Sequence, residues 1–430
     1  MGNQKSEHRA SVSDRHSQGK SSDALGGIGQ ALRSRNLVLY CSGLGLALTG
    51  TFVFVVALGW VTWEMTRSSA WVGTMVLAET IPNVIVSPFA GVLIDRTSAR
   101  GALFWAQLLA SITVSAMTVV TFGGWLSIEI LLGFVILLGA INGVAFPAHF
   151  TLMPKLVPRR DLSAAIAFQS SISQAARFVG PALAGIILVW FGVAAAFAFK
   201  ALSYYFLLFV LMLIRIDESK DRTLAKPGVI DELAAGVRYT WSSLTIRMLL
   251  VVAVALAILL RPVIEIMPAF VGSVLKSGPE PLGWLLPAAG LGAVFASLWL
   301  TWRGATRGIT RIMLLNFAAT AVVLIAFLFS DGLALGVACL FVYGFTSSVV
   351  LISNQILIQN TVDDRMRARV MSLYGISVRA LPALGAFIVG HLGEVFGLVP
   401  SLLGGGVFGF LFWLWIRRAA TRTGMAEGSE

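Results

Sequence analysis

Apolar segments long enough to cross a membrane recur between residue 36 and residue 416, separated by short stretches rich in charges, glycine and proline. A helix of about 20 residues spans about 30 Å of hydrocarbon, whereas barrel strands are half as long and alternate polar with apolar residues. The pattern therefore predicts an all-α integral membrane protein with twelve transmembrane helices, at residues 36–62, 71–94, 101–122, 127–152, 164–190, 194–215, 246–274, 282–302, 312–330, 333–358, 368–394 and 397–416.

Lysine and arginine are distributed very unevenly over the predicted loops. If the N-terminus is cytoplasmic, the loops on that side and the two tails hold nearly all of these cations, whereas the opposite loops hold only Arg67 and Lys276. Cytoplasmic loops of membrane proteins carry the excess of positive charge. The asymmetry predicts a multi-pass protein of the bacterial cytoplasmic (inner) membrane with both termini inside, which requires an even number of helices.

The most polar internal segment, from Arg215 to about Thr245, divides the chain in the middle. We expect it to link two six-helix halves and to contain a short amphipathic helix from Asp231 to Trp241. The expected organisation is a disordered cytoplasmic tail (1–33), an N-terminal bundle (34–215), a linker (216–245), a C-terminal bundle (246–417) and a second cytoplasmic tail (418–430).

Composition supports a membrane protein and narrows the function. The chain is 57% hydrophobic and 12% charged, with a mean hydropathy of +0.84, whereas soluble domains carry about 25% charged residues. The net charge of +11 resides in loops, so it does not indicate a nucleic-acid partner. No complete Gly-x-x-x-x-Gly-Lys-Ser/Thr phosphate loop and no nucleophile with a base or metal cluster occurs. We therefore expect neither an enzyme nor a bound cofactor or metal.

The two halves echo each other in sequence. The segment Leu156–Asp161 before the fifth helix resembles Thr361–Met366 before the eleventh. Arg177-Phe-Val-Gly-Pro-Ala-Leu183 within the fifth helix resembles Arg379-Ala-Leu-Pro-Ala-Leu384 within the eleventh. Parallel repeats of six helices, with a binding site at their interface near the middle of the bilayer, are typical of transporters.

Several motifs resemble those of the major facilitator superfamily over all twelve helices. Gly91-x-Leu93-x-Asp95-Arg96-x-x-x-Arg100 is similar to the signature between helices 2 and 3 of that family. Gly180-Pro181-Ala-Leu-Ala-Gly185 resembles the helix-5 signature of its proton-coupled antiporters. Pro147-Ala148, Met153–Pro158 and Gln169–Pro181 resemble the branch of the enterobactin exporters and lysophospholipid flippases. The resemblance implies two pseudo-symmetric six-helix bundles, and either an efflux antiporter or a lipid transporter.

Two sets of residues are candidates for a conformational gate. A carboxylate at the cytoplasmic membrane edge can accept hydrogen bonds from a helix N-terminus and thereby stabilise one of the two conformations of a transporter. Glycine and proline inside a helix remove backbone hydrogen bonds and permit a bend. The alternatives are a solvated turn and ordinary close helix packing. The predicted gate consists of Gly91, Asp95, Arg96, Arg100, Gly180, Pro181 and Pro382.

Ionisable residues within membrane segments are costly and are therefore functional candidates. Arg261 and Glu265 are four residues apart on one helix face, and Pro262 and Pro268 interrupt the helix around them. A carboxylate that alternates between a partnered and an unpartnered environment can take up and release a proton. We predict proton coupling by Glu265, with Glu79 as the second candidate and Arg261 as the partner; the alternative is a static ion pair that only positions helices.

The remaining intramembrane polar residues are predicted to line the substrate cavity. Counting Lys200 among the cations, the intramembrane charges leave an excess of two positive charges, which favours an anionic or zwitterionic amphiphile. Asn142 is the polar group of the fourth helix, and Gln174 lies one turn before Arg177. The predicted cavity residues are Arg177, Arg379, Lys200, Asn142 and Gln174.

These features predict a secondary transporter, a proton-coupled exporter of a small amphiphilic and possibly anionic molecule such as a siderophore or drug. Two alternatives stay open: a lysophospholipid flippase, and a non-transporting sensor or scaffold with the same fold. The expected partners are a small-molecule substrate, protons and the lipid bilayer, and the expected functional unit is a monomer.

Overall fold

The computed structural model describes residues 35–96, 98–158, 161–214, 229–304 and 308–422. The predicted N-terminal tail (1–33), most of the polar linker and the end of the C-terminal tail lie outside these residues. Within the described ranges all regular structure is helical, with no strand. An apolar helix satisfies its own backbone hydrogen bonds, which is what hydrocarbon surroundings demand.

The N-terminal half consists of α3 (Arg35–Thr66), α4 (Ser69–Arg96), α5 (Ala99–Phe122), α6 (Ile128–Leu152), η1 (Met153–Lys155) and α7 (Leu162–Leu213). α7 forms two crossings, because Gly192 within it has φ 78° and ψ −178°, a left-handed conformation that glycine adopts without strain. This break falls where the sequence predicts the turn between the fifth and sixth helices.

The C-terminal half begins with a crossing in four pieces: α9 (Leu244–Ala255), the π-helical turn η3 (Leu256–Leu260), α10 (Pro262–Glu265) and α11 (Met267–Ser273). Five long helices follow: α12 (Leu282–Arg303), α13 (Ile309–Leu328), α14 (Leu333–Thr361), α15 (Asp364–Phe396) and α16 (Leu398–Arg422). Among the described residues, 11 helical segments are long and apolar enough to cross a membrane. One of them, Ala164–Leu213, contains the break in α7, so the prediction of twelve crossings is confirmed.

The amphipathic helix expected from Asp231 to Trp241 is present as α8 (Val229–Ser242). It packs on the first turns of α15, where Gly236 lies against the backbone of Arg369. The Tyr239 hydroxyl donates a 2.9 Å hydrogen bond to Oδ2 of Asp363, the residue before α15. α8 is therefore attached to the C-terminal half.

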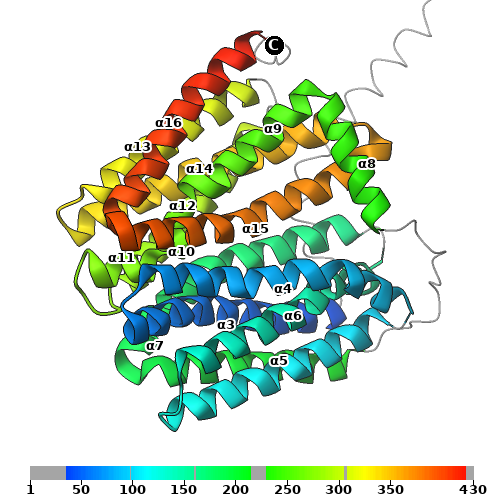
Figure 1. Cartoon of the computed structure of the whole chain (residues 1–430). Helices are drawn as coiled ribbons and strands as arrows, with labels where there is room; N and C mark the ends of the chain where they lie inside the picture. Colours follow the sequence, from blue (N-terminus) through cyan, green and yellow to red (C-terminus); the bar gives the residue numbers. More distant parts are fainter. Residues whose placement is uncertain (1–34, 97, 159–160, 215–228, 305–307, 423–430) are drawn as a thin grey trace, which may run out of the picture.

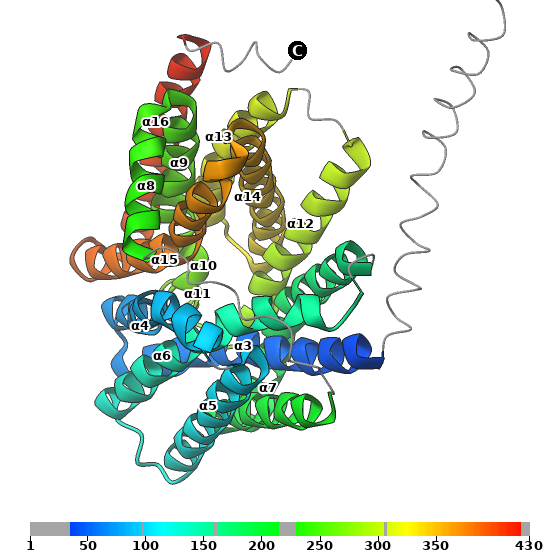
Figure 2. The ribbon, with the colours of Figure 1, turned by 90° about the vertical axis from the view of Figure 1, so that its right-hand side faces the viewer.

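The helices run between two ends of the molecule (Figure 1). We call the end that carries α8 the linker end and the opposite end the far end. At the linker end lie α8, the start of α3 and the end of α16. At the far end lie the turns that join α3 to α4, α5 to α6, α13 to α14 and α15 to α16. Figure 2, seen from the linker end, shows the N-terminal half below and the C-terminal half above.

The two halves meet mainly through α4 against α15 and α7 against α12. At the far end, a side chain at Gly73 would collide with the carbonyl of Ala386, and one at Gly390 with the carbonyl of Ser69. The backbones of α4 and α15 therefore touch there, and the helices diverge toward the linker end (Figure 1). The molecule is closed at the far end.

Candidate functional site

The site is built around the break in the first crossing of the C-terminal half. Pro262 has no N–H to donate, and the π-helical turn before it shifts the pairing so that the Arg261 N–H donates to the Leu256 carbonyl at 3.0 Å. Short π-helical turns within α-helices are frequent at functional sites. Beyond it, Ile266 leaves helical geometry at φ −95° and ψ 4°, which separates α10 from α11.

A tyrosine from another helix completes this break. The hydroxyl of Tyr343 on α14 donates a 2.9 Å hydrogen bond to the carbonyl of Leu260, directly before Arg261. Tyr343 is buried, and a carbonyl without a partner at this depth is costly. The hydroxyl therefore stabilises the broken helix in the middle of the protein.

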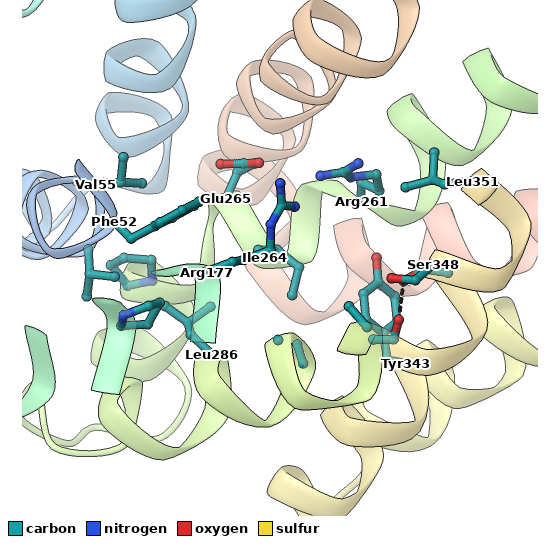
Figure 3. A pocket seen from close by; sticks show the side chains of 18 residues that line it. Phe52, Val55, Arg177, Arg261, Ile264, Glu265, Leu286, Tyr343, Ser348 and Leu351 are labelled. Carbon is teal, nitrogen blue, oxygen red and sulfur yellow. Dashed lines mark hydrogen bonds between the residues drawn. The ribbon is translucent and has the colours of Figure 1, made fainter. Parts of the chain in front are cut away.

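The first cavity lies between the two halves beside this break (Figure 3). α3 and α7 line it from the N-terminal half, and the broken crossing, α12 and α14 line it from the C-terminal half. Its volume is about 190 Å³, enough for several water molecules. The wall is largely apolar, with Phe52 on one side and Ser347 and Ser348 on another.

Three charged side chains face this first cavity: Arg177 from α7, and Arg261 and Glu265 from the broken crossing. Figure 3 shows both guanidinium groups and the carboxylate directed into the same space. No hydrogen bond or salt bridge joins Glu265 to either arginine in the part of the chain that the structure describes, and they interact through their charges across the cavity. The direct pair expected from the four-residue spacing is absent from this conformation.

A second cavity of about 130 Å³ adjoins the first. Glu79 and Thr80 of α4 and Arg379 of α15 line it, and it shares Val55 and Glu265 with the first cavity. The guanidinium carbon of Arg379 lies 3.6 Å from the ring centroid of Phe146 on α6, a cation–π contact that links the two halves. Glu265 thus stands between two compartments that carry different charges.

The predicted bend residues lie beside these cavities. Pro181 lines the first cavity, and Gly180 packs its backbone on Phe52 of α3. Pro382 is buried in α15 next to Ala383, which lines the second cavity. Both helices continue through their prolines in this conformation.

Three predicted cavity residues lie elsewhere. Asn142 and Gln174 are half-buried and do not line either cavity. Lys200 is fully buried within the N-terminal half, where its Nζ lies 3.5 Å from the ring centroid of Phe54 and 5.3 Å from that of Tyr204. Without Lys200, the three arginines and two glutamates of the two cavities leave one excess positive charge rather than two.

The predicted gate at the end of α4 is described only in part. The backbone is helical through Gly91, Asp95 and Arg96, and the side chains of Asp95 and Arg96 lie outside what the structure describes. Arg100, expected in a turn, belongs instead to the first turn of α5, because Ser98 caps that helix by accepting from the Gly101 N–H. Its guanidinium donates to the Leu211 carbonyl from Nε at 3.1 Å and from Nη2 at 2.9 Å, a contact within the N-terminal half.

Sequence reasoning missed Tyr343 and Phe52. A tyrosine within an apolar segment and beside a glycine, as in Tyr343-Gly344, is the signal that could have drawn attention to Tyr343. Phe52 carries no such signal, because its surroundings in the sequence are those of any lipid-facing phenylalanine. Among the described residues, no group of three or more His, Cys, Asp or Glu side chains is placed to hold a metal ion.

Two bundles around a charged central cavity define a secondary-transporter architecture. A family model described as transmembrane secretion effector, of the major facilitator superfamily, matches residues 37–427. The chain belongs to this family of membrane transporters, and the predicted all-α fold of two six-helix bundles is confirmed.

Known relatives cover most of the chain. It is 22% identical to the staphyloferrin A transporter of Staphylococcus aureus (strain NCTC 8325 / PS 47), over 83% of this chain and 89% of the relative. It is 24% identical to the multidrug efflux pump Tap of Mycolicibacterium fortuitum, over 82% of this chain and 88% of that pump. A bacterial homologue of the human lysosomal transporter Spinster, solved inward-facing and unoccupied, matches with a TM-score of 0.70 at 15% identity, over 91% of this chain and 97% of that one. The last similarity concerns the fold alone.

Proposed function

We propose that this transporter is a proton-coupled exporter of a small amphiphile with an anionic group, such as a siderophore or a drug. The observation that carries the proposal is the position of Glu265, a carboxylate on a broken helix between two cavities and facing two arginines without a direct bond to either among the described residues. The names of the two relatives, a staphyloferrin A transporter and a multidrug efflux pump, point to the same substrate classes.

We place the linker end in the cytoplasm. The turn η1 after α6, the helix α8 and the start of α13 lie at or near that end and hold Lys155, Arg238 and Arg311. The turns from α3 to α4 and from α11 to α12, at the far end, hold Arg67 and Lys276. Positive charge marks the cytoplasmic side of bacterial membrane proteins. The termini are then cytoplasmic, and the conformation with a closed far end is the one that loads substrate from inside the cell.

Charge arithmetic in the cavity restricts the substrate of an antiporter. Protonation of Glu265 makes the cavity more positive, so a purely anionic substrate would bind together with the proton and move in the same direction. A zwitterionic amphiphile behaves differently: its anionic group pairs with Arg177, and its cationic group competes with the proton for Glu265. Export against proton entry therefore favours a substrate with both groups.

Inside-out vesicles with an acidic interior test this proposal. A pH-sensitive dye reports proton loss as siderophores, lysophospholipids and drugs are added one at a time. We expect one zwitterionic amphiphile to dissipate the gradient saturably. Uptake of each labelled compound is measured in the same vesicles with and without the gradient. Saturable uptake that ignores the gradient would contradict coupling, lysophospholipid movement without a gradient would support a flippase, and no uptake of any compound would support a sensor or scaffold.

A further inference from the structure

A carboxylate of one half sits on the start of a helix of the other half at the far end. Oε1 of Glu394, in the last turn of α15, lies 3.2 Å from the Ala70 backbone N–H, which donates to it, and 3.3 Å from the Ser69 hydroxyl. Ser69 also donates to the Gly390 carbonyl at 2.8 Å, so its single proton is shared between two acceptors of α15. Glu394 thus binds the N-terminus of α4.

The start of α4 is well suited to an anion. The first N–H groups of a helix have no intrahelical partner, and the helix dipole places partial positive charge there. Ser68 satisfies one of these groups by accepting from the Trp71 N–H at 3.2 Å, which leaves the Ala70 N–H for Glu394. The contact therefore combines a charge, a helix terminus and a hydrogen bond.

The surrounding packing exists only while the two halves touch. Gly73 and Gly390 let α4 and α15 approach so closely that a side chain at either position would collide with the backbone of the opposite helix, and one at Gly393 would crowd the Ser69 hydroxyl. A separation of the helices at this end removes the Glu394 contacts and the glycine packing together. Glu394 itself is exposed, so water hydrates its carboxylate once the contact opens.

We propose that Glu394 is a positioning residue of the transport cycle, the latch that holds the far end closed. This proposal rests on transport by alternate opening of the two ends. It states that the contact of one side chain, Glu394, stabilises the conformation in which the far end is closed. Since the interaction is a charge at a helix terminus, removal of the charge alone weakens the latch and removal of the acceptor weakens it further.

A buried cysteine reports how often the far end opens. Val72 is fully buried on α4 and lines the second cavity. In full-length protein with Cys41 and Cys339 replaced by alanine, V72C is labelled with a membrane-impermeant maleimide added from the far side, without substrate or gradient. The labelling rate follows the population of far-end-open molecules.

We expect E394Q, which keeps a carbonyl acceptor but loses the charge, to raise the rate about two- to fivefold. E394A, which loses the acceptor as well, is expected to raise it about tenfold. E280A is the matched control, because Glu280 is an exposed carboxylate on the far-end turn between α11 and α12, and its rate should equal that of the parent.

A second reporter separates latch opening from general loosening. V114C, at a fully buried position on α5 inside the N-terminal half, should stay equally unreactive in all variants. Equal V72C rates in the parent, E394Q and E394A would overturn the proposal, as would a parallel rise at V114C. If E394A does not reach the membrane, E394Q decides alone. Because no substrate or proton gradient is used, a negative result leaves the proposed proton coupling untouched.

Discussion

The first crossing of each half lines the first cavity, and the two crossings are built differently. α3 in the N-terminal half is one uninterrupted helix of 32 residues, and it presents the uncharged Phe52, Val55 and Val56 to the cavity. Its counterpart is broken into four pieces and presents Arg261 and Glu265. The two charged residues lie where the helix is already interrupted and where a cavity adjoins it, which is where intramembrane charges are usually found. The first crossing of the N-terminal half thus supplies an uncharged part of the wall, and that of the C-terminal half supplies an arginine and a glutamate.

The largest effect is expected from making α3 resemble its counterpart. V56P removes a backbone donor and inserts a ring into a helix that has no bulge or tyrosine cap to absorb it, at a cost of about 3 kcal/mol. We expect little folded protein, measured as the monodisperse fraction in detergent. V56A, which keeps the N–H at this buried position, should give nearly normal yield. Normal yield of V56P would show that α3 tolerates a break too.

The next effect concerns the carboxylate of the broken crossing. E265Q keeps the size and polarity of the side chain but cannot exchange a proton, so gradient-driven flux should fall about 10- to 100-fold, the usual range of a coupling energy between two ligands. The measurement is substrate flux in vesicles with and without a pH gradient. E64Q, at an exposed glutamate of α3, is the control. Unchanged coupling in E265Q would move the assignment to Glu79.

A smaller effect is expected at Arg177, the charge that the N-terminal half contributes to the first cavity. R177Q removes a charge-assisted contact to the anionic group, so the half-saturating substrate concentration should rise about tenfold with a smaller change in maximal flux. R177K should recover part of the affinity, because lysine restores the positive charge but not the planar guanidinium group that can donate two parallel hydrogen bonds. The concentration dependence of flux measures both, and equal affinity in R177Q and the parent would exclude this contact.

The smallest effect is expected from repairing the break. P262A restores a backbone donor next to Arg261, and the chain can then approach the regularity of α3. Flux should fall only about two- to threefold, since the π-helical turn and the Tyr343 cap still hold the kink. Y343F removes the donor to the Leu260 carbonyl, and its combination with P262A measures their coupling through the non-additivity of the two effects. Additive effects would show that proline and tyrosine act independently.

Much of the fold follows from the length and spacing of the apolar segments. The crossings, the break at Gly192 and the helix α8 can be derived from apolar length, a glycine and a local amphipathic pattern. The charged residues of the broken crossing could also be located, because a glutamate beside prolines in an apolar segment is unusual. These are local properties of the chain.

Contacts between helices distant in sequence could not be predicted in this way. Lys200 lies in the N-terminal half rather than in the cavity because the rings of Phe54 on α3 and Tyr204 on α7 receive its ammonium group, and nothing local to residue 200 shows that α3 supplies a ring there. Arg100 likewise bonds to a carbonyl more than a hundred residues away. Periodicity reports which face is apolar, but not which partner will cover it.

The attachment of α8 to α15 has a mechanical consequence. α15 is a helix of 33 residues, about 50 Å long. Tyr239 of α8 is hydrogen-bonded to the residue before its first turn, and the start of α4 is hydrogen-bonded to its last turn. When a helix of this length tilts about its middle, its two ends move in opposite directions. A displacement of α8 at the linker end would therefore be transmitted along α15 to the contact between Glu394 and the start of α4, so that a segment between the two halves can influence whether the far end stays closed.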